Sequence, residues 1–352
     1  MLDKEKSRRG SATSLLCLLG TLVGPMAGAT DACSTTAIVT AAEVSVSDGG
    51  SFRTQSYFHS REAAAIRHID TSERVVAVEG PYSWADSGQD AELGGAALAS
   101  FSLGHQFHAF LWYFDDLVDG LEVDVDVSWA GSTYKGRRGN HPYGGRATLI
   151  DAGKDEQVLL LDIPDYGRIV VRYDDWRDEH GRRVPFLVSI DDGARVFDYR
   201  FSSVEFSDRD PLWFFEAVPS PSIDEVDVFR LHRKLLAAHC LGDAELMARL
   251  SASSTKIASR GELHNVSRDE IRQQFSSLFE RIDYTAYIDL KPPVVEIAAA
   301  RDLGFVAVNV RARGKSIGSD QLFDDQWAWI MIVSKIDGEW RHAGNASNYR
   351  EN

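Results

Sequence analysis

The chain has 352 residues, of which 44% are apolar and 10% aromatic, so it is long enough for about two domains that each bury an apolar core. Its formal net charge is −15. A surface this acidic repels polyanions, which argues against nucleic acid as a partner.

Residues 1–29 have the features of a secretory signal peptide. Four basic residues within the first ten precede an apolar run over 12–29, which ends in the small triplet Ala27-Gly28-Ala29. The run is short and is broken by glycines and Pro25, which favours export over a transmembrane anchor. We therefore expect a periplasmic or secreted protein.

Two cysteines, Cys33 and Cys240, would remain after removal of this segment. In an oxidising compartment they are able to pair. Alternatively, Cys33 is lipidated after processing, although residues 30–32 lack the apolar residue that a lipobox normally places three positions before its Cys. The sequence does not decide between the two fates.

Residues 36–215 consist mainly of strand patterns separated by turn signals. Leu121 to Val127 alternate apolar and acidic residues, which predicts an antiparallel strand with one wet face. Residues 95–117 have the apolar spacing of one or two helices. The other predicted strands lie within 74–85, 157–167, 167–176, 184–193 and 194–206.

The stretches 143–190 and 198–214 resemble the LolA/LolB-like family of periplasmic lipoprotein carriers. This resemblance implies a curved antiparallel sheet, a half-barrel with few helices, that surrounds an apolar hollow closed by helices. It brings no catalytic motif with it.

A linker is predicted at residues 216–223, where Pro219 and Pro221 remove backbone donors and disfavour helix in the residues before them. The pattern then changes to a helix stripe at Val228, Leu231 and Leu235, followed by Gly-Asp, a short helix and a strand. A capped helix after Ser267 and an antiparallel meander complete the chain.

This order over residues 224–352, with "LGDAELMARL", "SRGELHNVSRDEIRQQF" and "IDGEWRHAGNASN", resembles the NTF2-like superfamily and its SnoaL-like members. The resemblance implies an α+β cone, and hence an α+β fold class for the whole chain. In the ketosteroid isomerase branch an Asp, a Tyr and a late acid carry the chemistry. The matching positions here are Ser259, Leu235 and Trp329 or Ile330. The catalytic residues of that branch are therefore absent.

Other polar residues suggest a different catalytic set. If the strand face that carries Asn309 lines the cone, then Arg311, Asn309, His342 and Glu262 would converge as acid, base and anion holder. The competing interpretation is that Arg311 is solvated or paired with an acid and that His342 is a packed sheet residue. Whether the protein is an enzyme therefore stays open.

The expected function is binding of a small apolar or lipid-like ligand, with an isomerase-, cyclase- or dehydratase-type enzyme as the alternative. We expect no cofactor and no metal. The basic loop 134–146 is a candidate contact with an anionic membrane. Both faces of the strand over 327–333 are apolar, so the outer face needs a cover. That cover is either a second copy, which predicts a homodimer through this sheet, or the first domain of the same chain. The residues expected around a ligand are Leu235, Ser259, Trp327, Trp329 and Trp340.

Overall fold

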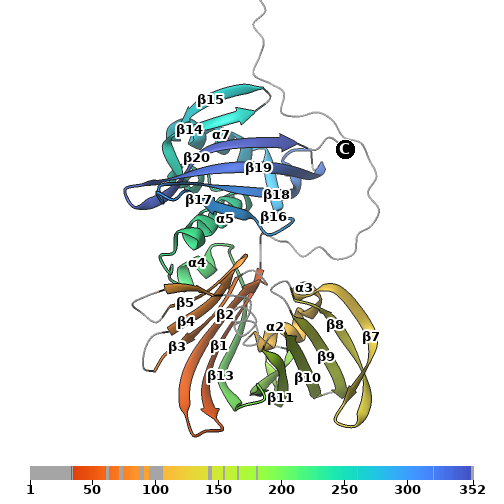
Figure 1. Cartoon of the computed structure of the whole chain (residues 1–352). Coiled ribbons are helices and arrows are strands. Elements are labelled where there is room, and N and C mark those ends of the chain that lie inside the picture. The colour runs from red at the N-terminus through yellow and green to blue at the C-terminus, as the bar shows by residue number, and fades with distance from the viewer. Residues whose placement is uncertain are drawn as a thin grey trace, which may run out of the picture. The chain divides into compact units, whose positions relative to one another are not determined.

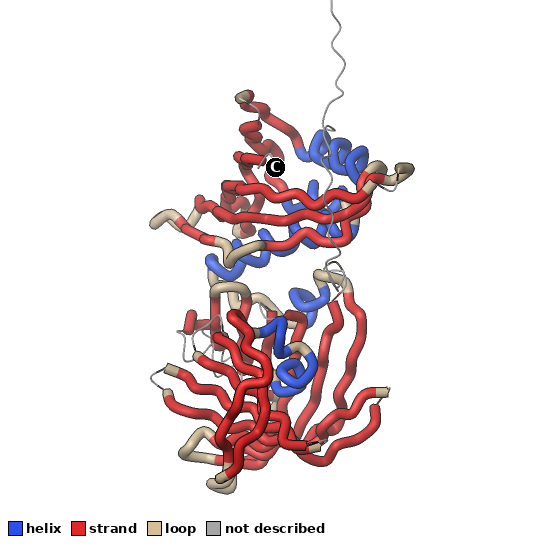
Figure 2. The backbone as a smooth tube through the Cα atoms, turned by 90° about the vertical axis from the view of Figure 1, so that its right-hand side faces the viewer, coloured by secondary structure: helices blue, strands red, loops and turns tan. Residues whose placement is uncertain are grey.

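The computed structural model describes residues 33 and 35–349, apart from 61–62, 71–73, 87–90, 95–105, 142–144, 154, 165, 180, 260 and 320. The expected signal peptide lies outside the described residues, and so does the first part of the helical stretch expected over 95–117. Strands make up most of the described chain, as Figures 1 and 2 show.

The first half of the described chain forms one antiparallel sheet of thirteen strands, in the order β6-β5-β4-β3-β2-β1-β13-β12-β11-β10-β9-β8-β7. Neighbours in the sheet are neighbours in sequence, except that β1 and β13 pair at the centre. The strands are β1 Thr35–Val46, β2 Ser51–Ser60, β3 Ala63–His68, β4 Arg74–Glu79, β5 Tyr82–Asp86, β6 Ala91–Gly94, β7 Asp119–Trp129, β8 Ser132–Asn140, β9 Arg146–Gly153, β10 Glu156–Ile163, β11 Gly167–Glu179, β12 Arg182–Asp191 and β13 Val196–Arg209.

Two short helices, α2 (Phe107–Trp112) and α3 (Phe114–Leu117), pack on this sheet. The spacing of Phe107, Phe110 and Phe114 places their rings on one side, and all three are buried in the same apolar cluster as the strand residues. The apolar strand side chains of this cluster are therefore covered by side chains from α2 and α3.

The strand predicted over Leu121–Val127 is present within β7, but its strict alternation is not kept. The pairing with β8 is interrupted twice between Asp119 and Val125, and Asp124 has a φ of 55°. Leu121 and Val123 are consequently exposed, whereas Val127 is buried. The physical reason is that β7 is an edge strand, where irregular pairing turns side chains away from one common face.

The segment between the two sheets contains the helix α4 (Trp213–Ala217) and an irregular stretch over 219–223. The helix α5 (Asp224–Leu241) follows, ends at Gly242 in the left-handed conformation, and is succeeded by α6 (Ala244–Leu250). The side chain of Asp243 caps α6 by accepting a hydrogen bond from the Leu246 N–H. The predicted helix, Gly-Asp and short helix are confirmed, while the division into two domains stays a prediction.

The second half forms a seven-stranded sheet in the order β15-β14-β20-β19-β18-β16, with β17 also paired to β18. The strands β14 and β20 are parallel, and the other pairs are antiparallel. The strands are β14 Ser251–Ser259, β15 Glu262–Ser267, β16 Ile282–Asp289, β17 Val294–Ile297, β18 Leu303–Ser316, β19 Leu322–Ile336 and β20 Glu339–Tyr349.

The helix α7 (Arg268–Phe279) begins with the predicted capping box of Ser267 and Glu270. The strand β15 was not predicted, because its exposed residues show no apolar alternation, and it exists through its pairing with β14.

The helices α5, α6 and α7 cover one face of the seven-stranded sheet, which we call the covered face. Val306 of β18 is buried there against Leu231 and Leu235 of α5 and Ile271 of α7. The opposite face, which we call the open face, carries Ile330, whose residue surface is 49% exposed. None of the helices in the described part of the chain combines the length and apolarity required to cross a membrane.

Cys33 and Cys240 form a disulfide that joins the chain just before β1 to the last turn of α5, with 5.2 Å between their Cα atoms. This decides between the two fates left open by the sequence, because a paired Cys33 has no free thiol for lipidation.

Candidate ligand-binding hollow

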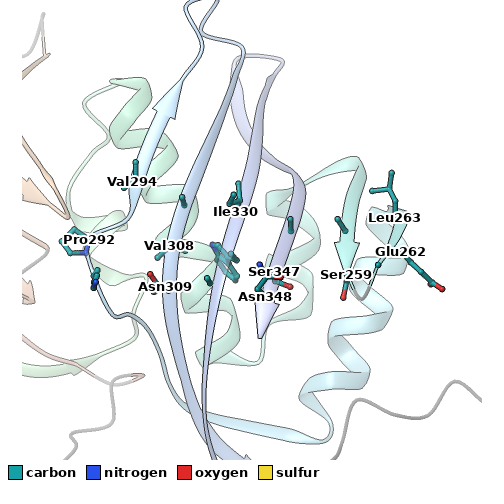
Figure 3. A pocket seen from close by; sticks show the side chains of 17 residues that line it. Ser259, Glu262, Leu263, Pro292, Val294, Val308, Asn309, Ile330, Ser347 and Asn348 are labelled. Atoms are coloured by element: carbon teal, nitrogen blue, oxygen red, sulfur yellow. The ribbon is translucent and has the colours of Figure 1, made fainter. Parts of the chain in front are cut away.

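The open face of the seven-stranded sheet contains a hollow of about 750 Å³, which is within the size range of small-molecule sites. Figure 3 looks onto this face, with the helices behind the strands. The lining residues are Ala258, Ser259, Gly261, Glu262, Leu263, Lys291, Pro292, Val294, Ala307, Val308, Asn309, Ala328, Trp329, Ile330, Ala346, Ser347 and Asn348.

Apolar residues cross the floor of the hollow in a single line, which we call the apolar row. Residues that lie directly opposite each other on adjacent strands point to the same face, so the register defines a continuous strip. In order across six strands the row is Val294, Ala307, Ile330, Ala346, Ala258 and Leu263. The alanines leave space between the three larger side chains.

A line of amides borders the apolar row on one side. Asn309 lies opposite Ala328, and Ala328 lies opposite Asn348. Figure 3 shows Asn309 and Asn348 displaced to the same side of Ile330. The hollow therefore offers apolar contact along its floor and hydrogen-bonding groups along one border.

The alternation of β18 explains why this face is hollow locally. Val306, Val308 and Val310 are buried on the covered face, whereas Ala307 and the exposed Asn309 lie on the open face. The valine side chains therefore fill the covered side, and the small side chain of Ala307 and the polar side chain of Asn309 are left on the open side.

Four of the residues singled out from sequence line the hollow: Ser259, Glu262, Asn309 and Trp329. The Glu262 side chain is 75% exposed and lies 3.4 Å from His264. The indole ring of Trp329 packs edge-on against His232, with 5.8 Å between the ring centroids.

The structure does not bring Arg311, Asn309, His342 and Glu262 together. The Arg311 guanidinium donates hydrogen bonds of 2.6 and 2.5 Å to Asp324 and lowers the pKa of that carboxyl. His342 lies opposite the buried Val333, and burial lowers its pKa to about 4 despite a hydrogen bond with the Gly344 backbone. The expected convergence required the Asn309 face to lie under the helices, and the helices cover the other face.

The remaining residues expected around a ligand lie away from the hollow. Leu235 is buried in α5, and Trp327 stacks on Tyr287. The Trp340 Nε1–H donates to Asp224 over 2.9 Å. Asp224 also accepts hydrogen bonds from Lys335 and Arg301, so Trp340 belongs to a buried structural node.

A buried pair on the covered face was missed by the sequence reasoning. His232 Nε2 lies 2.9 Å from the Asp289 carboxylate, and both side chains are 0% exposed. Burial alone would raise the pKa of Asp289, but His232 and Arg233 lower it. His232 Nδ1 and Trp329 Nε1 have no partner among the described residues. Only the pairing of α5 with β16 in space reveals this site, since the two residues are 57 positions apart.

Most of the basic segment expected as a loop over 134–146 is strand. Residues 134–140 belong to β8, and 142–144 lie outside the described residues. Lys135 pairs with Asp126, Arg137 with Asp115, and Arg146 with Glu122. The acidic neighbours offset these positive charges, and the membrane contact itself stays a prediction.

No family model matches the sequence, and no curated protein does either. Solved structures are similar over part of the chain. An NTF2-like superfamily protein from Salmonella enterica has 11% identity and a TM-score of 0.33, with 38% of this chain and 95% of that one covered. A ketosteroid isomerase-like protein from Erwinia carotovora has 15% identity and a TM-score of 0.32, with 37% and 98% covered.

An NTF2-like protein from Cytophaga hutchinsonii has 19% identity and a TM-score of 0.30, with 35% of this chain and 95% of that one covered. Matches at this level of identity and TM-score establish neither a family nor an activity for this chain.

Proposed function

We propose that this is an exported protein that binds a small apolar or lipid-like ligand in the hollow on the open face. The observation that carries the proposal is the apolar row, because six apolar side chains from six strands form one solvent-accessible strip. Leu263, Val294 and Ile330 are each about half exposed or more, and burial against a ligand would remove that apolar surface from water.

Binding without catalysis is favoured over the enzymatic alternative by the position of the titratable groups. Glu262 and Lys291 are the charged residues among the described residues that line the hollow, and both are exposed, while His342 and the His232–Asp289 pair lie on the covered face. A general acid or base has to reach its substrate within hydrogen-bond distance. A ligand in the hollow would have the sheet between itself and those histidines.

The test is native mass spectrometry of the protein exported by a bacterial host and purified without detergent. We expect an additional mass that organic extraction identifies as an apolar small molecule. Ala346→Leu, which places a larger side chain at the centre of the row without entering the core, should lose this mass, and Ala91→Leu on β6 should keep it. Equal ligand content in both variants would contradict the proposed site.

A further inference from the structure

We propose that the ligand is a long-chain carboxylate, whose chain lies along the apolar row and whose carboxylate is held at the Lys291 end. This inference rests on the proposed function and specifies the chemical class of the ligand.

The shape of the row is that of a single extended chain. It crosses six strands at right angles to their direction, and with strands about 4.8 Å apart its length is about 24 Å. Asn309 and Asn348 limit its width on one side. On the other side, Phe305 and Ile332 lie opposite each other on the same face but outside the hollow. The length of the row across six strands matches an unbranched chain better than a compact ring system.

The two ends of the row differ in charge. Lys291 lines the hollow near Val294, and Glu262 lines it next to Leu263. Lys291 forms no ion pair among the described residues, whereas the cations Arg311, Arg313 and Lys315 of β18 are all paired with acids. An anionic group is therefore attracted to the Lys291 end and repelled by Glu262 at the other.

The side-chain amide of Asn309, a neutral donor, lines the same hollow as this lysine. The Leu290 N–H donates to the Asn309 carbonyl oxygen over 2.8 Å, which holds the backbone before Lys291 against β18 at Asn309. An ammonium and a side-chain amide together supply donors for both oxygens of a carboxylate. In a chain with a net charge of −15, this cation makes the Lys291 end of the hollow locally positive.

A second copy of the chain is the competing occupant of the open face. A standard interface buries about 800 Å² on each partner. The row is about 24 Å long and about 7 Å wide, the distance between same-face residues along a strand, so its area is roughly 170 Å². The row alone is therefore far smaller than such an interface. The size of the row, and Lys291 as the cation among the described residues that line the hollow, favour the small amphiphile.

The experiment titrates delipidated full-length protein with hexadecanoate and with hexadecan-1-ol below their aggregation limits. We expect one hexadecanoate per chain, and Lys291→Gln should weaken hexadecanoate binding roughly three- to tenfold while leaving the alcohol unchanged. Lys256→Gln is the matched control, because Lys256 is exposed on the same sheet face but outside the hollow. Ala346→Leu should weaken both amphiphiles.

The outcomes separate the two proposals. If the acid and the alcohol bind alike and Lys291→Gln changes neither, the carboxylate is refuted while apolar binding in the hollow stands. If neither amphiphile binds, the long-chain carboxylate is refuted, and the proposed function is decided by its own mass-spectrometric test. If both bind and Ala346→Leu has no effect on either, the hollow is not the binding site and both proposals fail. Sedimentation of wild type as a dimer that Ile330→Glu dissociates would assign the open face to a second copy instead.

Discussion

Arg230 of α5 and Glu79 of β4 form a buried ion pair that links the two halves of the chain. The guanidinium donates two hydrogen bonds to the carboxylate, of 2.6 and 2.5 Å, and the side chains are only 5% and 0% exposed. Trp84 donates a third hydrogen bond to Glu79, and Arg230 also donates to the carbonyl oxygens of Val218 and Pro219. The pair therefore holds β4, α5 and the irregular segment together.

Glu79→Gln should lower the free energy of unfolding by about 3–5 kcal/mol, because it leaves the Arg230 charge buried without its counter-ion. Urea unfolding at neutral pH measures the change. Asp162→Asn is the matched control, since the Asp162–Arg168 pair is exposed and should contribute less than about 1 kcal/mol. Equal effects of the two substitutions would show that Arg230 is solvated in the folded protein.

The disulfide between Cys33 and Cys240 should stabilise the folded chain. It closes a loop with a sequence separation of 207, which restricts the unfolded state. Replacing both cysteines with serine should cost about 2–5 kcal/mol of stability in urea. Mass measurement after alkylation of the unreduced, unfolded protein should find neither cysteine modified, and a chain with both cysteines alkylated would refute the pairing.

Asp224 should make stability depend on pH. Burial alone would raise its pKa, but hydrogen bonds from Lys335, Trp340 and Arg301 lower the pKa from 3.8 to about 2. Since the folded value lies below the unfolded one, the contribution of about 2 kcal/mol is fully present above pH 3.8 and is lost as the pH falls toward 2.

Asp224→Asn should therefore be less stable than wild type at pH 7, and the gap should narrow between pH 4 and pH 2. Urea midpoints across this range measure it. Asp302→Asn, at an exposed position, is the control, and its stability should differ little from that of wild type at either pH. A gap that stays constant with pH would contradict the role given to the Asp224 charge.

Gly80 is required where β4 turns toward β5. Its φ is 58°, and an added Cβ would lie 2.2 Å from the Phe229 ring. Gly80→Ala should therefore cost about 2–4 kcal/mol, the sum of backbone strain and overpacking. Gly193 also has a positive φ, but the space around it is open. Gly193→Ala should therefore cost about 1 kcal/mol of stability. Thermal unfolding compares the two, and similar losses would mean that Phe229 moves aside freely.

Several elements of the second half could be predicted from sequence because their signals are local. The apolar stripe of α5, the glycine after it, and the Ser267–Glu270 capping box each depend on residues a few positions apart, and all three occur in the structure. Alternation along β18 was likewise visible, since it follows from the two-residue repeat of a strand.

The side of the sheet that the helices cover was decided only by tertiary structure. Both faces of β19 are apolar, so its pattern gives the helices no preferred side. The sequence therefore left open which face the helices cover, and the structure leaves the Asn309 face open. The apolar row, the His232–Asp289 pair, the Cys33–Cys240 disulfide and the Arg230–Glu79 pair join residues far apart in the chain. Such pairs depend on strand register and on the packing of α5. The energies that determine both are summed over the whole core, so the local sequence around each residue does not indicate its partner.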